Sequence, residues 1–178
     1  GDLTEPDVAR WCVDLAVQTF GRLDVVVNAA GGLTGMGAIV DTDIEVFDRE
    51  FDSNFKTTYL VSYAAAKEMV RQGAGAIVNF ASVAALLARP SMAAYSAAKA
   101  GVAALTRSLA IEVRDKGVRV NAVAPGLARS DASAEATRDE KDVAWVRTEE
   151  IVSAVLFLSS DLASGITGHV LPVAHGEA

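Results

Sequence analysis

Short apolar stretches alternate with longer amphipathic ones along the chain. Residues of high β-propensity cluster in four short stretches, which predict strands at 23–29, 76–81, 118–123 and 169–173. Helical spacing of apolar residues predicts four helices, at 6–20, 54–71, 95–115 and 149–159. Near-continuous apolar strands are typical of parallel strands covered on both faces. The alternation therefore predicts an α/β fold, a doubly wound parallel sheet with right-handed crossovers and helices on both faces.

Local signals mark the helix ends. Pro6 lies close behind Thr4, a candidate N-cap. Gly21 is predicted to end the first helix, and Gly117 to end the third in the left-handed conformation. The segment 131–147 lacks periodicity and follows a strand end, where ligands bind in open α/β sheets. A solvated surface loop is the alternative interpretation of this segment.

The composition limits the classes of protein that the chain can represent. Its 178 residues fit one domain, 1–178, and 51% of them are hydrophobic, which excludes a disordered chain. The formal net charge of −7 argues against nucleic acid and against anionic membrane surfaces as partners. The sequence contains no apolar run long enough to span a membrane.

Cysteine and histidine usage argues against metal chemistry. The single cysteine, Cys12, excludes an intrachain disulfide and a zinc cluster, and it is expected to be a small buried apolar residue. His169 and His175 are interpreted as structural or surface residues, because no cluster of histidines and carboxylates accompanies them. We therefore predict no metal site and a reducing, cytoplasmic setting.

Tyr95 and Lys99 are the first candidates for chemistry. Their i, i+4 spacing puts a phenol and an ammonium on one helix face. Free tyrosine has a pKa of about 10 and is a poor base at neutral pH, whereas a neighbouring cation favours the phenolate. We expect Lys99 to lower the pKa of Tyr95, with a bound cationic cofactor ring adding to the effect. The spacing alone is a weak signal of catalysis, so the interpretation depends on which other residues accompany the pair.

Other polar and small residues gather where the predicted strands end. Ser82 follows the second strand, where its hydroxyl can donate to a substrate oxygen. Asn28 ends the first strand, and the small residues 29–32 let the backbone approach a ligand closely. Asn54 is expected at the start of a helix, where its amide can hold a water or distort the first turn. These positions share the carboxyl edge of the sheet, where open α/β folds bind ligands.

The order and spacing of these residues resemble the small one-domain branch of the short-chain dehydrogenase/reductase family over essentially the whole chain. Residues 28–31 resemble the family's N-N-A-G motif, with Ala29 in place of the second Asn. Residues 95–99 match its Y-x-x-x-K motif, and 121–126 match its segment ending in Pro-Gly. Residues 165–168 are similar to the I-T-G before its last strand.

The resemblance implies a Rossmann-like fold and a Ser-Tyr-Lys-Asn tetrad that interconverts an alcohol and a carbonyl by hydride transfer with NAD or NADP. Ser82 would polarise the substrate oxygen, and Tyr95 would act as general acid/base. Lys99 would support Tyr95 and bind the nicotinamide ribose, and Asn54 would hold a water in a proton relay. The resemblance implies a cofactor site lined by Asp2, Leu3, Asn28, Ala30, Gly31, Tyr95, Lys99, Pro125, Gly126, Ala128 and Ser130.

The resemblance also points to a segment that this sequence does not contain. The family begins with a βαβ portion that carries a glycine-rich phosphate loop, and the chain corresponds to the two thirds to three quarters of the fold that follow it. Residues 31–37 match G-x-x-x-G-x-G but do not open directly into a helix, so we do not interpret them as the phosphate loop. We expect the strand at 23–29 to form an exposed edge, and these 178 residues alone to bind NAD(P) weakly.

Three functions remain open from the sequence. The first is an NAD(P)-dependent oxidoreductase that acts on a small alcohol or ketone. The second is an epimerase or dehydratase on the same scaffold, and the third is a non-catalytic scaffold or dimerisation module. The chain shows no second, C-terminal substrate domain, which favours the first over the second. Segments 83–88, 92–94 and 131–147 are expected to line the substrate pocket, and the resemblance implies a homodimer or homotetramer.

Overall fold

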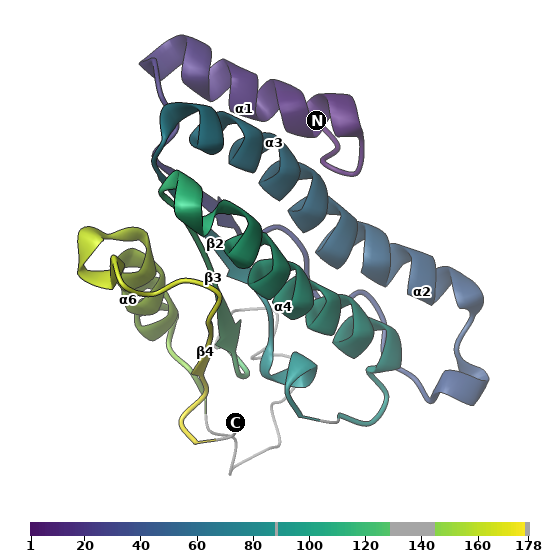
Figure 1. The fold of residues 1–178 in the computed structure, drawn as a ribbon. Helices are drawn as coiled ribbons and strands as arrows, with labels where there is room; N and C mark the ends of the chain where they lie inside the picture. The colour runs from purple at the N-terminus through teal and green to yellow at the C-terminus, as the bar shows by residue number, and fades with distance from the viewer. Residues whose placement is uncertain (88, 129–144, 177–178) are drawn as a thin grey trace.

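The computed structural model contains one four-stranded parallel sheet (Figure 1). It describes residues 1–87, 89–128 and 145–176. The strands stand in the order of the sequence, as β1 Val25–Asn28, β2 Gly75–Phe80, β3 Val118–Pro125 and β4 Val170–Val173. Every pairing is parallel, so the carboxyl ends of the strands meet at one edge. The predicted parallel sheet is confirmed.

Helices cover both faces of the sheet, as predicted (Figure 1). One face carries α1 Pro6–Phe20, α3 Thr57–Gln72 and α4 Ala93–Val113, and the other carries α6 Thr148–Ser159. Short 3₁₀ helices span Ile39–Asp41, Val83–Ala85, Arg114–Lys116 and Asp161–Ala163. None of the described helices has the length and apolar character needed to cross a membrane.

Alternate side chains of β2 build two separate apolar cores. Ile77 lies in the cluster that contains Met69 of α3 and Val113 of α4. Its neighbour Val78 lies in the cluster formed with Leu158 of α6. Successive strand side chains point to opposite faces, so a strand that is covered on both faces must be apolar at nearly every position.

The helix predicted at 54–71 is part of a longer helical run. α2 Ile44–Glu50 continues through a π-helical segment, Phe51–Lys56, into α3, and Figure 1 shows one nearly straight rod. Asn54 therefore lies inside the π-helical segment and not at a helix start, which corrects the prediction. The pattern missed α2 because Ile44 and Phe47 are exposed there, which blurs the amphipathic stripe. A π-helical segment within an α-helix often marks a functional site.

Two predictions about the first helix are wrong. Glu5, not Thr4, occupies the N-cap position of α1, and the Thr4 hydroxyl instead donates to Asp2 Oδ1 (2.8 Å). Cys12 is exposed, because α1 buries only the face that carries Ala9 and Val13. The left-handed cap at Gly117 is confirmed, with a φ of +76°, and α1 ends at Gly21 as predicted, with a φ of +80°.

β1 is an edge strand in the described part of the chain, as expected. It pairs with β2 alone. Val26 packs against the core under α1 and α3, whereas Val25 and Val27 alternate to the opposite face and are exposed. On that face α6 contacts β2, β3 and β4.

Buried polar side chains cross the sheet beneath α3 and α4. Asn28 Nδ2 donates to Ser62 Oγ (2.9 Å) and to Asn79 Oδ1 (2.8 Å). Asn79 Nδ2 in turn donates to Thr106 Oγ1 (2.9 Å). All four residues are buried, and mutual pairing offsets the cost of removing their polar atoms from water. The network therefore joins β1 and β2 to the two helices above them.

Asn79→Ala should lower the free energy of unfolding by about 2–3 kcal/mol. The substitution leaves the buried Asn28 amide without the oxygen to which it donates, and the buried Thr106 hydroxyl without the N–H from which it accepts. Urea denaturation monitored by circular dichroism measures the change. Ser153→Ala, which removes an exposed hydroxyl on α6, should cost less than about 0.5 kcal/mol. Equal losses in the two variants would contradict a stabilising network.

Candidate active site

Ser82 lies at the carboxyl edge of the sheet, just after β2. The strand ends at Phe80, and Ser82 continues with extended backbone and a buried side chain. Its Oγ accepts a hydrogen bond from Ala84 N (3.2 Å) and so caps the 3₁₀ helix Val83–Ala85. This local cap fixes the direction of the hydroxyl at the strand end.

α4 brings Tyr95 and Lys99 to the same place. Lys99 Nζ donates to Phe80 O (2.9 Å) and lies 5.8 Å from the centroid of the Tyr95 ring. The Tyr95 hydroxyl is hydrogen-bonded with the Ser82 side chain. Lys99 is 4% exposed, so its ammonium is inside the protein. The structure thus places Ser82, Tyr95 and Lys99 together at the end of β2.

A second Tyr–Lys pair has the same spacing as Tyr95 and Lys99 but a different environment. Lys67 Nζ on α3 lies 5.2 Å from the centroid of the Tyr63 ring. Tyr63 is 56% exposed, so water screens the pair. The i, i+4 spacing is therefore common to both pairs, and only the pair on α4 is buried against a strand end and a serine.

Burial dominates the pKa of Tyr95. Removal from water raises the pKa above its usual value, the hydrogen bond with Ser82 acts in the opposite direction, and the negative charge of Glu50 raises it further. The expected lowering by Lys99 is therefore not what the structure shows for the protein by itself. The phenol is protonated at neutral pH, which suits donation of a proton to a substrate oxygen.

Burial also lowers the pKa of Lys99, to about 8, while the charge of Glu50 raises it. A buried ammonium loses hydration, which favours the neutral amine. With a pKa of about 8, Lys99 is still mostly charged at neutral pH. The site therefore holds a positive charge that it loses under mildly alkaline conditions.

Asn54 is fully buried and fastens the loop after β1. Its Oδ1 accepts from Gly32 N (3.0 Å), and its Nδ2 donates to Gly32 O (2.9 Å) and to Glu50 Oε2 (2.8 Å). Its backbone carbonyl accepts from Thr58 Oγ1 (3.0 Å). The side chain thus positions the loop, and the water-holding role expected for Asn54 stays a prediction.

Gly31 is required by the close approach of this loop to the π-helical segment. Its φ is +121°, in the region that favours glycine. A Cβ at this position would lie 2.6 Å from Asn54 Oδ1 and 2.9 Å from Ser53 O. Any larger residue would therefore push the loop away from Asn54.

The neighbouring loop residues divide between core and surface. The Asn28 side chain points into the buried polar network, so only its backbone is available to a ligand at the strand end. Ala29, Ala30, Gly31 and Gly32 are exposed. The result is a ledge of nearly bare backbone at the carboxyl end of β1.

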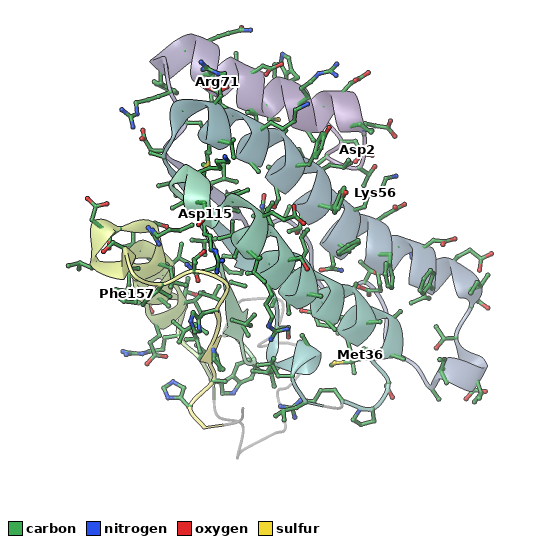
Figure 2. All side chains as sticks on the ribbon, in the orientation of Figure 1. Asp2, Met36, Lys56, Arg71, Asp115 and Phe157 are labelled. Carbon is green, nitrogen blue, oxygen red and sulfur yellow. The ribbon has the colours of Figure 1, made fainter. Side chains whose placement is uncertain are left out.

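Asp2 and Leu3 lie near the start of α1. Asp2 is exposed and lies close to Lys56 of the π-helical segment, as Figure 2 shows. Its pKa is lowered chiefly because the Thr4 backbone N–H donates to its carboxylate. Leu3 is half-buried.

The predicted residues after β3 lie at the same edge of the sheet. Pro125 ends β3, and Gly126 N donates to Val173 O (3.0 Å) at the end of β4. Ala128 forms an isolated parallel bridge with Val146. Ser130 and most of the predicted pocket segment 131–147 lie outside the described residues.

An apolar pocket lies on another side of α4. Its lining includes Gly37, Ile44 and Phe47, together with Ala93, Ala94 and Ala97. Of the segment 92–94 expected to line a substrate pocket, two residues face it, but Ser82, Tyr95 and Lys99 do not. The described residues contain no cluster of His, Cys, Asp and Glu side chains that could hold a metal ion. His175 is instead paired with one carboxylate, with its Nε2 atom 2.9 Å from Glu150 Oε2.

Glu50 is a site residue that the sequence did not reveal. It is 0% exposed, it binds Asn54, and its charge acts on both Tyr95 and Lys99. In the sequence it stands among charged residues that look like a solvated helix face. Its position four residues before Asn54 was the available signal, because that spacing puts both side chains on one helix face.

Comparison with known proteins places this geometry in a family. The model of a family described as enoyl-(acyl carrier protein) reductase matches residues 1–177. An uncharacterized oxidoreductase of Thermotoga maritima is 38% identical over 182 residues, covering 94% of this chain and 72% of that protein. The L-rhamnose 1-dehydrogenase (NAD(P)(+)) of a Sphingomonas species is 35% identical over 187 residues, covering 99% and 73%.

Solved structures agree with these relatives. The structure of ElxO with NADP bound superimposes with a TM-score of 0.92 at 30% identity, covering 97% of this chain and 74% of that one. The chain belongs to the short-chain dehydrogenase/reductase family.

Proposed function

We propose that the chain carries the catalytic half of an NAD(P)-dependent oxidoreductase that interconverts an alcohol and a carbonyl. The observation that carries the proposal is the meeting of Ser82, Tyr95 and Lys99 at one strand end, with Lys99 Nζ bonded to Phe80 O at 2.9 Å. General oxidoreduction with NAD or NADP follows from membership of the family. The assignment of Asn54, Ser82, Tyr95 and Lys99 as the tetrad is the step that we add.

The residues present fit the nicotinamide-ribose end of a dinucleotide. The exposed backbone of residues 29–32 offers a ledge without bulky side chains, fixed from below by Asn54. The Lys99 ammonium has three N–H donors, and among the described residues Phe80 O is the acceptor recorded for it. Its remaining donors suit ribose hydroxyls. When bound, the cofactor supplies or accepts the hydride.

The protein side of the reaction is proton transfer and orientation. Ser82 donates a hydrogen bond to the substrate oxygen and holds it beside Tyr95. Tyr95, protonated at neutral pH because burial raises its pKa, gives its proton to a carbonyl oxygen and takes one back from an alcohol. Lys99 stabilises the phenolate that remains.

The substrate is a small alcohol or ketone. Val83 and Ala84, which follow Ser82, are buried apolar residues, and Ala94 lies one residue before Tyr95. Apolar walls beside one serine hydroxyl favour a substrate whose polar group is confined to the reacting carbon. We place the reaction in the cytoplasm, in line with the single exposed cysteine.

A second copy of the chain is the partner that we propose, as a homodimer or homotetramer. α3 and α4 present exposed large side chains that include Tyr59, Tyr63 and Ile111. Large apolar side chains exposed on adjacent helices are surface that a second subunit would bury.

Tyr95→Phe should lower turnover by roughly 10²–10⁴-fold, because it removes the proton donor and leaves the ring in place. Absorbance of the reduced nicotinamide, followed over a panel of alcohols and ketones, measures the rate. Tyr63→Phe removes the hydroxyl of the exposed Tyr–Lys pair and should retain full activity. Undiminished turnover in Tyr95→Phe would refute the role of Tyr95.

Lys99→Met removes a buried charge, which favours the variant at about pH 7, but it also leaves Phe80 O without its donor and Glu50 without its cation. The pKa of Lys99 falls from 10.5 to about 8 on burial, so removal of the charge contributes up to about 3 kcal/mol in favour of the variant at about 1.4 kcal/mol per pKa unit. Between these values the unfolded chain holds a proton that the folded chain has released, so wild-type stability rises with pH.

The stability of Lys99→Met relative to the wild type should therefore fall as the pH rises from about 8 to about 10. Urea denaturation of both proteins across this range measures it. Lys67→Met, at the exposed pair, should show no such dependence. A constant difference between Lys99→Met and the wild type would contradict a buried, titrating Lys99.

A further inference from the structure

Glu50 is a buried carboxylate with a full set of partners. It ends α2 and is 0% exposed. Oε1 accepts from Thr34 N (2.6 Å), Thr34 Oγ1 (2.7 Å) and Gly35 N (3.1 Å), and Oε2 accepts from Asn54 Nδ2 (2.8 Å). Burying a charge is costly unless it is hydrogen-bonded and paired. The four bonds meet the first requirement, and a nearby cation is needed for the second.

Glu50 and Asn54 hold the loop after β1 at different points. Asn54 binds both backbone groups of Gly32, and Glu50 binds the N–H groups of Thr34 and Gly35. Glu50 and Asn54 also bind each other. The loop 31–35 is thus fixed to α2 and the π-helical segment at two points.

Glu50 and Lys99 are both buried, on helical elements that contact each other. α2 and the π-helical segment both pack against α4. The charge of Glu50 favours the charged form of Lys99 and opposes ionisation of Tyr95. Lys99 Nζ also donates to the Phe80 carbonyl on β2 and lies 5.8 Å from the centroid of the Tyr95 ring on α4 itself.

The remaining charged groups on these elements point to solvent. On α2 and the π-helical segment they are Glu45, Asp48, Arg49, Asp52 and Lys56, all exposed. On α4 they are Arg107 and Glu112, also exposed. Exposed charges are screened by water and salt, so Glu50 is the anion that matters to Lys99 among the described residues.

We propose that Glu50 is a positioning residue of the active site, which holds the loop 31–35 against Asn54 and supplies the buried negative charge that keeps Lys99 an ammonium. The first role orders the ledge on which a cofactor would rest. The second preserves the cation that stabilises the Tyr95 phenolate. The consequence for catalysis rests on the proposed function, whereas the two roles themselves can be measured without turnover.

Titration of Lys99 by NMR tests the charge role. The chain has five lysines, so protein labelled with ¹³C at lysine Cε gives a simple spectrum, and Lys99→Arg identifies the Lys99 signal. Glu50→Gln removes the charge and keeps an oxygen for Thr34 and Gly35. Its Lys99 midpoint should fall by at least about half a pH unit. An unchanged or higher midpoint would overturn the charge role.

Two further variants separate charge from shape. Thr34→Val removes one hydrogen bond and keeps the charge, so its Lys99 midpoint should match the wild type. Glu50→Met is neutral and places no donor against Asn54, so it gives the same answer as Glu50→Gln if that variant does not fold. A midpoint that falls equally in Thr34→Val and in the neutral variants would show that only loop packing matters.

Amide hydrogen exchange tests the loop role. Glu50→Asp keeps the charge and shortens the reach, so exchange at Thr34 and Gly35 should accelerate at least about tenfold. Glu50→Gln should exchange more slowly there than Glu50→Asp. Unchanged exchange in Glu50→Asp would overturn the loop role.

A rate profile then separates this proposal from the proposed function. In an active enzyme, the alkaline limb of the rate profile in Glu50→Gln should shift to lower pH together with the Lys99 midpoint. If the wild type shows no turnover with any alcohol or ketone, the proposed function fails, and the titration and exchange results still decide the two roles of Glu50.

Discussion

The buried ammonium of Lys99 is the interaction on which the rest of the site depends. Only 4% of the surface of Lys99 is exposed, so the charge loses most of its hydration and must be stabilised by its neighbours. The ammonium is bonded to the last carbonyl of β2, which ties α4 to the strand end that also presents Ser82. Burial brings the pKa of Lys99 down to about 8, close to the working range of a cell. The charge is thus retained at a cost in stability, as is common where a site needs a group that the fold alone would not favour.

The second element of the site is a loop with almost no side chains, held rigidly by buried polar ones. Gly31 can approach Asn54 because it lacks a Cβ, and the π-helical segment turns Asn54 toward the loop. Glu50 adds a second point of attachment and a compensating charge. A catalytic or binding site gains from this arrangement because bare backbone offers a ligand close contact, while a fixed frame prevents the loop from moving away.

The periodicity of the sequence predicted most of the fold, because the helices and strands bury regular faces of apolar side chains. Ile77 and Val78 are buried in cores on opposite faces of the sheet, so successive residues of β2 are apolar and the strand was recognisable as a nearly continuous apolar run. α1 was predicted with its observed bounds, since Pro6 and Gly21 punctuate it clearly. α2 escaped because Ile44 and Phe47 are exposed, and Cys12 was misjudged because α1 buries a single narrow face.

The sequence by itself determined the α/β alternation, the approximate positions of the strands and the family motifs at 28–31, 82, 95–99 and 121–126, because those depend on local propensity and spacing. It did not separate Tyr95–Lys99 from Tyr63–Lys67 by spacing, and it showed Glu50 as one more charged helical residue. Only the tertiary structure decided these points. Burial and hydrogen bonding depend on which segments meet, and it is the removal of water that turns a charged pair on a helix into a site with shifted pKa values.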